Sequence, residues 1–338
     1  MQHTIPPQVE IFNIIGGYWL SRAVYLAARL KLADVVGDRP TTLSTIAAAT
    51  GTKPEPLRRL MRALAAHGFF QDTGNEMFSH TPLSETLRSD RPGSMRAFAE
   101  AELGHDHYES WRYVESCLRE DGTAFERVYG MPIWCYYAEH SETNALFGEA
   151  MTNLTAIANS GVLADYQFAP FRHAVDVGGG HGSFLCAILD HHPSSATAVL
   201  FDLSSVLAEA QKADFIKRHH ARLQLIGGDF FEAVPEGGDL YLLKFVLHDW
   251  NDERSGVILN NIRQVIDPSG RLVVVEIVLP PMNEPHIGPL IDLNMMVMTG
   301  GVERTKVEYR NLLARSGFRM NRVIATRSPF SVIEAAPA

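Results

Sequence analysis

Apolar residues follow one pattern before about residue 165 and a different pattern after it. The first part contains long segments in which apolar residues recur at helical spacing, whereas the second contains short continuous apolar runs separated by helical segments. Continuous apolar runs are typical of parallel strands that are covered on both faces. The pattern therefore predicts a mainly helical N-terminal region followed by an α/β domain with a doubly wound, Rossmann-like sheet.

The N-terminal region has the outline of a winged helix. Residues 11–36 are apolar on several sides of the predicted helices, which indicates burial against a partner such as a second subunit. In residues 41–87, a helix opening with Pro54 is followed by two short strands around a turn at Gly74 and Asn75. The apolar face predicted for that helix consists of Leu57, Leu60, Met61 and Leu64.

Charge argues against a nucleic-acid role for this module. Residues 41–80 contain four basic and three acidic residues, and the whole chain carries a formal net charge of −9. A DNA-reading domain requires a clear basic stripe, so a DNA-binding regulator with a ligand-sensing domain is kept only as a remote alternative.

Composition places the chain among ordinary globular proteins, with 46% hydrophobic and 20% charged residues. The three cysteines, Cys117, Cys135 and Cys186, form no C-x-x-C pair and are typical of reduced thiols. No signal peptide and no apolar run of membrane-spanning length is recognised. We therefore expect a cytoplasmic protein.

Residues 93–165 are predicted to be helices rich in large apolar side chains. Most of these side chains are expected in the core, and a few can line a pocket for a flat ligand. The predicted division is a dimerisation-type domain at 1–92, a helical linker or cap at 93–165 and a cofactor-binding catalytic domain at 166–338. The large side chains of the middle segment are Trp111, Tyr113, Trp134, Tyr136, Tyr137, Phe147 and Met151.

Strands are expected at the five apolar runs of the C-terminal part, with helices between them. The predicted strands are 174–177, 197–203, 223–229, 239–248 and 271–280, followed by two final strands at 318–327 and 330–335. The predicted helices are 183–192, 204–217, 252–266 and 305–315. In such sheets ligands bind beyond the carboxyl ends of the strands.

The first strand carries Asp176 and leads into a glycine loop with Gly178, Gly180 and Gly182. The spacing is G-x-G-x-G and differs from the G-x-G-x-x-G of dinucleotide-binding proteins. A glycine loop alone does not identify a ligand, because ligand-free turns also require glycine.

Acidic residues end the next two strands and favour a phosphate-free ligand. Asp202 can accept hydrogen bonds from both ribose hydroxyls, Asp229 can accept from an adenine amino group, and Phe230 can pack on the purine. These two acids lack a compensating arginine and would repel a pyrophosphate, which disfavours a nicotinamide dinucleotide and favours S-adenosylmethionine. Each acid also has a structural alternative as a helix N-cap.

A histidine and two glutamates form a candidate acid–base group. Lys244, His248 and Asp249 end the fourth apolar run. Glu276 ends the core of the fifth strand, and Glu303 follows the turn TGGVERT. A buried carboxylate beside a histidine fixes its tautomer and raises its basicity, so one or both glutamates can serve His248 in this way.

Six ordered motifs carry a family resemblance over nearly the whole chain. The sequence resembles the S-adenosylmethionine-dependent small-molecule O-methyltransferases, which include plant caffeate and flavonoid enzymes, the hydroxyindole enzyme and bacterial enzymes acting on polyketide and phenazine products of secondary metabolism. The motifs are VDVGGGHGSF, FDL, GGDFF, LKFVLHDWND, VVVEIVLP and DLNMMVMTGGVERT.

The resemblance assigns roles to individual residues. It implies that the glycine loop wraps the methionine end of the cofactor, that Asp202 and Leu203 meet the ribose, and that Lys244 contacts the cofactor side of the pocket. His248 would be the general base, flanked by Glu276 and Glu303. The N-terminal domain would bind a second copy of the chain through the helix near 11–26.

The expected reaction is methyl transfer to a phenolic hydroxyl, without a metal ion. N- or C-methylation with the same cofactor, or a hydroxylase-like outcome, is the enzymatic alternative. The predicted acceptor pocket comprises Trp111, Trp134, Phe147, Met151, Asp249, Asn294, Met295 and Met298.

Overall fold

The computed structural model describes residues 5–338 and divides into two compact units. The first comprises the chain up to Tyr108 together with Glu142–Asn153, and the second comprises Glu109–Ser141 and Leu154–Ala338. Helix α11, Ser141–Asp165, contributes to both units. Residues 93–165 are thus shared between the units, and the three-part division made from the sequence stays a prediction.

The first unit is helical with one small sheet. Its antiparallel sheet has the order β1-β3-β2, and the turn between β2 and β3 has positive φ at Asn75 and Glu76, as expected of a tight hairpin turn. Helix α4 begins with Pro54 and buries Leu57, Met61 and Leu64, as predicted, while the fourth predicted residue, Leu60, is half-buried. The elements are α1 (Pro7–Arg29), α2 (Leu32–Val36), β1 (Thr41–Thr42), α3 (Leu43–Thr50), α4 (Pro54–Ala66), β2 (Phe70–Gly74), β3 (Met77–His80), α5 (Pro82–Glu85), α6 (Arg96–Glu102) and the start of α7 (His105–Trp111).

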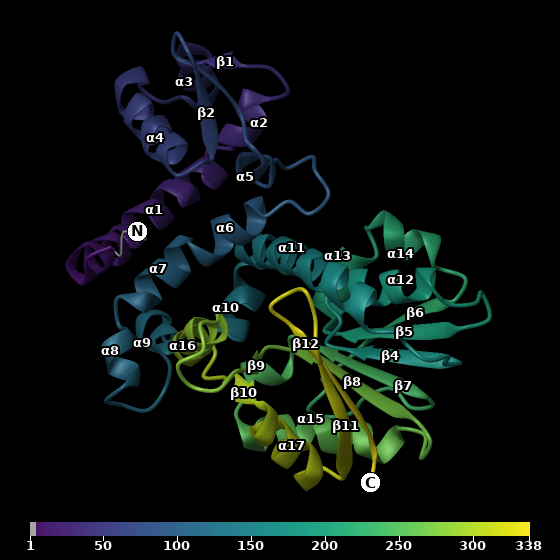
Figure 1. Cartoon of the computed structure of the whole chain (residues 1–338). Coiled ribbons are helices and arrows are strands. Elements are labelled where there is room, and N and C mark those ends of the chain that lie inside the picture. Colours follow the sequence, from purple (N-terminus) through teal and green to yellow (C-terminus); the bar gives the residue numbers. More distant parts are fainter. Residues whose placement is uncertain (1–4) are drawn as a thin grey trace. The chain divides into compact units, whose positions relative to one another are not determined.

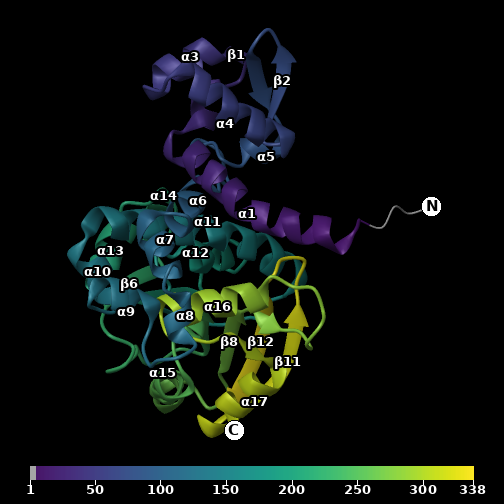
Figure 2. The same ribbon diagram turned by 90° about the vertical axis from the view of Figure 1, so that its left-hand side faces the viewer.

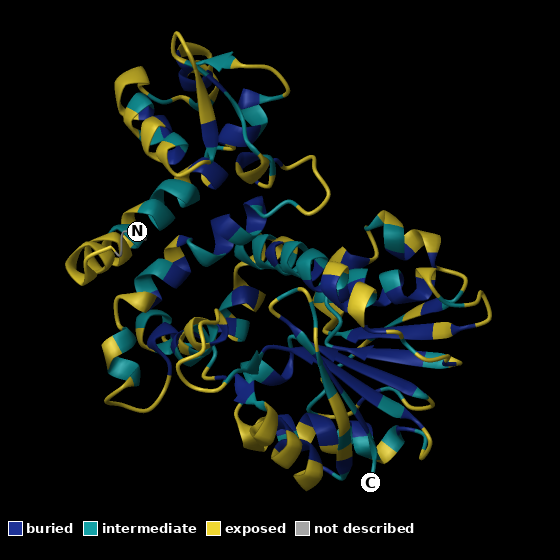
Figure 3. Ribbon diagram, viewed as in Figure 1, coloured by how far each residue is buried: buried dark blue, intermediate teal, exposed yellow. Residues whose placement is uncertain are grey.

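Helix α1 exposes a large apolar face within this unit. Its N-terminal half extends beyond the bundle formed by α2 to α5 (Figure 2) and is coloured as exposed in Figure 3. The apolar side chains on this face are 45–66% exposed, which is unfavourable in water for so large a patch. The exposed residues are Val9, Ile11, Phe12, Ile14, Ile15, Tyr18 and Trp19.

The second unit is built on a seven-stranded sheet of order β11-β12-β8-β7-β4-β5-β6 (Figure 1). All neighbouring strands from β8 to β6 are parallel, and β12 is antiparallel to both of its neighbours. The strands are β4 (His173–Val177), β5 (Thr197–Asp202), β6 (Leu223–Gly227), β7 (Leu240–Lys244), β8 (Arg271–Glu276), β11 (Phe318–Ala325) and β12 (Ser331–Pro337). This is the doubly wound fold predicted from the sequence.

Helices cover both faces of the sheet. Side chains of α11, α12, α13 and α14 form one core with the sheet, and those of α15 and α17 form the other. Successive residues of β8 alternate between these cores, which explains why its sequence is apolar throughout. The helices are α12 (Ser183–Asp190), α13 (Ser204–Ala210), α14 (Asp214–Arg218), α15 (Asp252–Val265) and α17 (Lys306–Arg315).

Smaller elements lie beside the carboxyl ends of the strands. Helix α16 packs on α8 and α9, and the short strands β9 and β10 pair in parallel. These elements are α8 (Val114–Cys117), α9 (Ala124–Tyr129), α10 (Ile133–Glu139), η1 (Leu247–Asp249), β9 (Val278–Leu279), α16 (Gly288–Met298) and β10 (Arg304–Thr305).

Three predicted elements are interrupted in the structure. The run at 239–248 leaves the strand after Lys244, because Phe245 has a φ of 58° and the chain turns into η1. The run at 271–280 divides into β8 and β9, and the helix predicted at 204–217 divides into α13 and α14. Among the described residues, no helix combines the length and apolarity that a membrane crossing requires.

Candidate active site

The order of strands reverses at β4, so the carboxyl end of β4 borders the crevice in which doubly wound sheets bind ligands. The glycine loop leaves β4 at this point. Gly178 has a φ of 69°, and a Cβ there would lie 2.8 Å from Cγ2 of Val246. Gly182 has a φ of 78°, and its Cβ would lie 2.8 Å from Cδ2 of Leu200. Glycine is therefore required at Gly178 and Gly182. Gly180, between them, is different: an added Cβ would meet no atom there, so the backbone at this position is open.

Asp202 is tied to the glycine loop. One carboxylate oxygen accepts a hydrogen bond from the Gly180 N–H at 2.8 Å, and the other accepts from the Leu203 N–H at 2.7 Å. Burial raises the pKa of Asp202, and the two N–H groups and Lys244 oppose that effect. Because each carboxylate oxygen has two acceptor sites, Asp202 retains capacity for ligand hydroxyls.

Asp229 and Phe230 follow β6, one strand further out. Asp229 is exposed and accepts a hydrogen bond from the Phe231 N–H at 2.8 Å. The Phe230 ring packs edge-on against Phe231 and Trp250, with centroid separations of 4.8 and 6.2 Å. An exposed acceptor beside a half-buried aromatic ring suits a flat ligand with an amino group.

Asp176 and Lys244 place opposite charges beneath the loop. Asp176 is fully buried, and its carboxylate oxygens have no hydrogen-bond partner among residues 5–338. Burial raises the pKa of Asp176 to about 7 despite Lys244, and burial lowers the pKa of Lys244 to about 8 despite the neighbouring acids. The Lys244 ammonium donates to the Thr155 hydroxyl at 2.8 Å. An orphaned carboxylate at this point suits a ligand that brings its own ammonium group.

His248 lies in η1 between the two glutamates. Its Nδ1–H donates to Oε1 of Glu303 at 2.7 Å, and Oε2 of Glu276 lies 3.7 Å from the same nitrogen. Since Nδ1 carries the proton in this hydrogen bond, Nε2 of the neutral ring is left as an acceptor. The only charged group near Nε2 among the described residues is Asp249, whose Oδ1 is 3.8 Å away.

The two glutamates contribute differently. Oε1 of Glu276 accepts hydrogen bonds from the N–H groups of Val246 and Leu247, at 3.0 and 2.9 Å. Glu276 therefore holds the main chain of the turn, whereas Glu303 bonds the imidazole directly. Both carboxylates are buried, and each has one oxygen without a hydrogen-bond partner among the described residues.

The electrostatics of the cluster favour a cationic imidazole. Burial lowers the pKa of His248, but Glu276, Glu303 and Asp249 together outweigh that effect and raise it well above the usual range. Burial raises the pKa of Glu276 and brings that of Asp249 to about 7. The site can thus stabilise a proton on the imidazole. His248, Glu276 and Glu303 also offer three ligand atoms within 4.8 Å of one another, so the absence of a metal stays a prediction.

Acceptor-side residues are brought together in part. Trp111 Nε1 donates to Oδ1 of Asn294 at 2.8 Å, and the rings of Trp134 and Trp250 are 6.3 Å apart. Met295 and Met298 lie on α16 with Asn294, although Met298 is buried. Phe147 and Met151 lie on the part of α11 that belongs to the first unit, and their role stays a prediction.

Three residues of the site were missed in the sequence. Thr155 binds Lys244, and Oδ1 of Asp292 accepts a hydrogen bond from the Glu303 N–H at 2.8 Å. Arg304 is 1% exposed and binds the turn that carries His248. Only Arg304 had a usable signal, because it directly follows Glu303 in the motif VERT.

The chain matches two family models that describe these regions. Residues 12–90 match an O-methyltransferase dimerisation domain, and residues 111–319 match an O-methyltransferase domain.

Individual relatives match along nearly the whole chain. The phenazine O-methyltransferase PhzM of Lysobacter antibioticus is 39% identical over 333 residues, covering 98% of this chain and 97% of the relative. The 8-amino-8-demethylriboflavin N,N-dimethyltransferase of Streptomyces davaonensis is 33% identical, covering 92% and 90% of the two chains.

Solved structures show the same architecture. The crystal structure of LaPhzM matches with a TM-score of 0.92 at 39% identity, covering 99% of this chain and all of the other. The structure of CalO1, a methyltransferase in calicheamicin biosynthesis, in its SAH-bound form matches with a TM-score of 0.85 at 32% identity, covering 98% of both chains.

The bond between His248 and Glu303 gives a first prediction. Glu303→Gln removes the carboxylate that stabilises the imidazolium, so the pKa of His248 should fall by about one pH unit or more. An NMR titration of the His248 ring protons measures this change. Glu308→Gln, a substitution in the nearby capping box of α17, should leave the titration unchanged. An unaltered pKa in Glu303→Gln would assign the imidazolium to Glu276 and Asp249 instead.

Proposed function

The chain belongs to the O-methyltransferase family, and we propose that it transfers a methyl group from S-adenosylmethionine to a phenolic hydroxyl of an aromatic small molecule. His248 is the general base in this proposal. The observation that carries it is the hydrogen bond from Nδ1 to Glu303, which leaves Nε2 to accept the hydroxyl proton.

The cofactor assignment is supported by the donor and acceptor groups around the glycine loop. Asp202 accepts from the ribose, Asp229 from the adenine amino group, and Asp176 pairs with the ammonium of the methionine moiety. The open backbone at Gly180 allows close approach of the cofactor, and Gly178, Gly182, Leu203, Phe230 and Lys244 complete the site in this proposal. The SAH-bound state of CalO1 agrees with this assignment. When bound, S-adenosylmethionine supplies an electrophilic methyl group attached to a cationic sulfur.

The protein must align the acceptor oxygen and remove its proton. A phenol with a pKa of about 10 is only about 0.1% ionised at pH 7, so a base beside the hydroxyl is useful. The neutral form of His248 takes the proton at Nε2, and the buried carboxylates of Glu303 and Glu276 stabilise the resulting imidazolium. Asp249, Asn294 and the surrounding tryptophans and methionines are assigned to the acceptor pocket in this proposal.

Methylation of nitrogen is the second candidate, since the relative from Streptomyces davaonensis is named as an N,N-dimethyltransferase. The mass and fragmentation of the product distinguish an O-methyl from an N-methyl group. Both matching family models describe O-methyltransferases, which favours the enzymatic proposal over a DNA-binding role. We also propose a homodimer, because the α1 face with Ile11, Phe12 and Ile15 is exposed and residues 12–90 match a dimerisation domain.

The base assignment predicts the effect of His248→Ala. Turnover should fall at least ~100-fold, because a positioned general base contributes about 10²- to 10⁴-fold. The affinity for S-adenosylhomocysteine, measured by calorimetry, should change little. His191→Ala, which removes an exposed histidine at the end of α12, is the matched control. A loss of turnover below tenfold would contradict a role for His248 as the base.

The cofactor assignment predicts the effect of Asp202→Asn. The substitution halves the acceptor capacity offered to the ribose and disturbs the bond to Gly180, so S-adenosylhomocysteine should bind at least ~10-fold more weakly. Asp214→Asn, at an exposed position of α14, should bind as the unaltered protein does. NADH should not bind to any of them. Equal affinity of Asp202→Asn and the control would remove Asp202 from the cofactor site.

The exposed face of α1 predicts self-association. Phe12→Glu together with Ile15→Glu introduces two charges into this face, and sedimentation analysis should show a dimer dissociation constant raised at least ~10-fold, because an unpaired charge is costly in a dry interface. Gln211→Glu on the second unit introduces a glutamate at an exposed polar position and should leave the dimer dissociation constant unchanged. A monomeric parent protein, or a dimer unaffected by both glutamates, would argue against this interface.

A further inference from the structure

We propose that Arg304 is a positioning residue for the methyl transfer: its buried guanidinium holds the turn that carries His248 against the segment that carries Glu303. The expected effect of Arg304 on turnover rests on the proposed function. The hydrogen bonds from which its role is inferred all lie within the second unit. Arg304 acts through the main chain, since three of its hydrogen-bond partners are main-chain carbonyls and none is the imidazole.

The guanidinium of Arg304 uses all of its hydrogen-bonding capacity. An arginine has five N–H donors in a planar fork, and the structure gives five acceptors for them. Nη1 donates to the carbonyl of Leu247 at 2.9 Å and to that of Val302 at 3.3 Å, and Nη2 donates to the carbonyl of Trp250 at 2.8 Å. The remaining partners are Oδ1 of Asp252, at 2.9 Å from Nε, and Oγ of Ser255, at 3.3 Å from Nη2.

The acceptors bracket the candidate base. Leu247 directly precedes His248, and Trp250 directly follows Asp249, so the two carbonyls fix both ends of the turn that carries the histidine. The third carbonyl, that of Val302, directly precedes Glu303. One rigid group therefore binds both segments whose side chains meet in the hydrogen bond of 2.7 Å between His248 and Glu303.

The two segments are also in direct contact beside the guanidinium. The Val302 N–H donates to the carbonyl of His248 at 2.8 Å. A Cβ at Gly301 would lie only 1.9 Å from that carbonyl oxygen, so the approach is possible only for glycine. Arg304 thus closes a contact that leaves no room for an inserted side chain.

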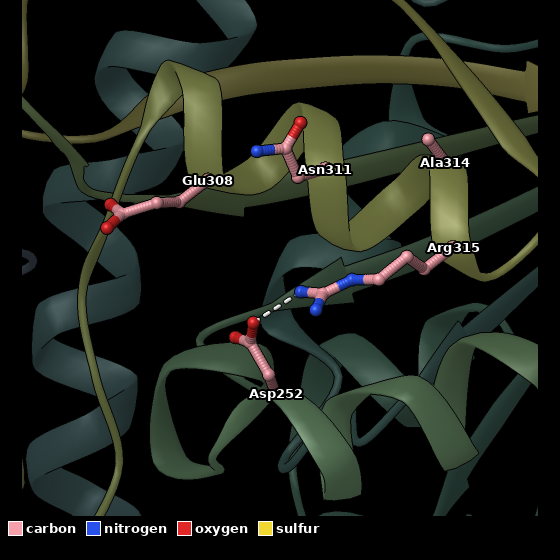
Figure 4. Close-up of a pocket in the computed structure, with 5 residues that line it drawn as sticks. All are labelled: Asp252, Glu308, Asn311, Ala314 and Arg315. Atoms are coloured by element: carbon pink, nitrogen blue, oxygen red, sulfur yellow. Dashed lines mark hydrogen bonds and ion pairs between the residues drawn. The ribbon is translucent and has the colours of Figure 1, made fainter.

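The charge of Arg304 is compensated from the protein surface. Arg304 is 1% exposed, whereas the side chain of Asp252, its charged partner, is 50% exposed. On the solvent side the same carboxylate binds Arg315, within a surface hollow between α15 and α17 lined also by Glu308, Asn311 and Ala314 (Figure 4). Asp252 therefore bonds one arginine inside the protein and a second arginine at the surface.

Lysine is a poor substitute at position 304. Its ammonium keeps the charge but has three donors at one atom, whereas the five acceptors are spread around a planar fork. Arg304→Lys would leave main-chain carbonyls of the turn without partners, and the turn would be free to shift. A misplacement of about 1 Å can cost about 100-fold in rate when reacting groups must be aligned.

The test compares Arg304→Lys with Arg315→Lys. Both substitutions replace an arginine that binds the carboxylate of Asp252 by a lysine. Arg304 lies inside the protein, whereas Arg315 lies at its surface. In Arg304→Lys we expect kcat to fall at least ~10-fold, with the affinity for S-adenosylhomocysteine changed less than twofold and KM affected less than kcat. In Arg315→Lys we expect all three quantities to stay as in the parent protein.

The pH dependence separates positioning from general destabilisation. His248 must be neutral to accept a proton, so kcat/KM should fall as the pH falls through the pKa of His248. A looser contact with Glu303 stabilises the imidazolium less, which lowers that pKa. In Arg304→Lys, the acid limb of the kcat/KM profile and the NMR titration of His248 should therefore both move to lower pH. In Arg315→Lys, neither should move.

Each outcome decides the proposal. An unchanged kcat and an unchanged His248 titration in Arg304→Lys would overturn it, and so would a parallel loss of thermal stability, cofactor affinity and kcat. If Arg304→Lys does not fold, Asp252→Asn should shift the His248 titration in the same direction by a smaller amount, and no shift overturns the proposal. Full turnover by His248→Ala would instead contradict the proposed function, in which His248 is the general base. The NMR titration of His248 would still test the role of Arg304.

Discussion

The structure around the candidate site depends on one electrostatic constraint, which is that several ionisable groups are buried together at the carboxyl ends of β7 and β8. Removing a carboxylate from water costs several kcal/mol even after the protein relaxes. Glu276 recovers part of this cost from two main-chain N–H groups, and Glu303 recovers it from the imidazole of His248. The turn η1 exists in its observed form because its backbone and its side chain satisfy these two carboxylates at once.

The glycine-loop side of the candidate site follows the same constraint. Burial lowers the pKa of Lys244, and the charges of Asp176, Glu276 and Asp202 oppose that effect. Glu276 raises the pKa of both Lys244 and His248, so the groups beneath the glycine loop and those around the histidine share one acidic neighbour. A cationic ligand beside Asp176 would change the balance that holds Lys244, and through Lys244 the environment of Glu276.

The sequence allowed the sheet, the glycine loop and the positions of the candidate acids to be predicted, because alternating cores make whole strands apolar and functional residues follow their ends. It did not show that Phe245 adopts a positive φ, which ends β7 at Lys244 and directs His248 toward Glu303. It also left open which glutamate bonds the histidine. These details depend on main-chain hydrogen bonds between segments far apart in the sequence, and local periodicity carries no information about them. Arg304 escaped notice for the same reason, since charged residues are mostly exposed and its burial follows from five acceptors contributed by other parts of the fold.

The buried histidine–glutamate pair also bears on the choice between oxygen and nitrogen acceptors. A neutral amine is nucleophilic without losing a proton, so its methylation requires alignment but no base before the methyl transfer. A phenol is a weak nucleophile until it is ionised, and its proton needs a place to go. Two carboxylates buried at 0% and 1% exposure around one imidazole are a costly arrangement if alignment is the only task. The same arrangement is directly useful if a proton must be taken from a hydroxyl, and this difference in chemical need favours oxygen as the atom that is methylated.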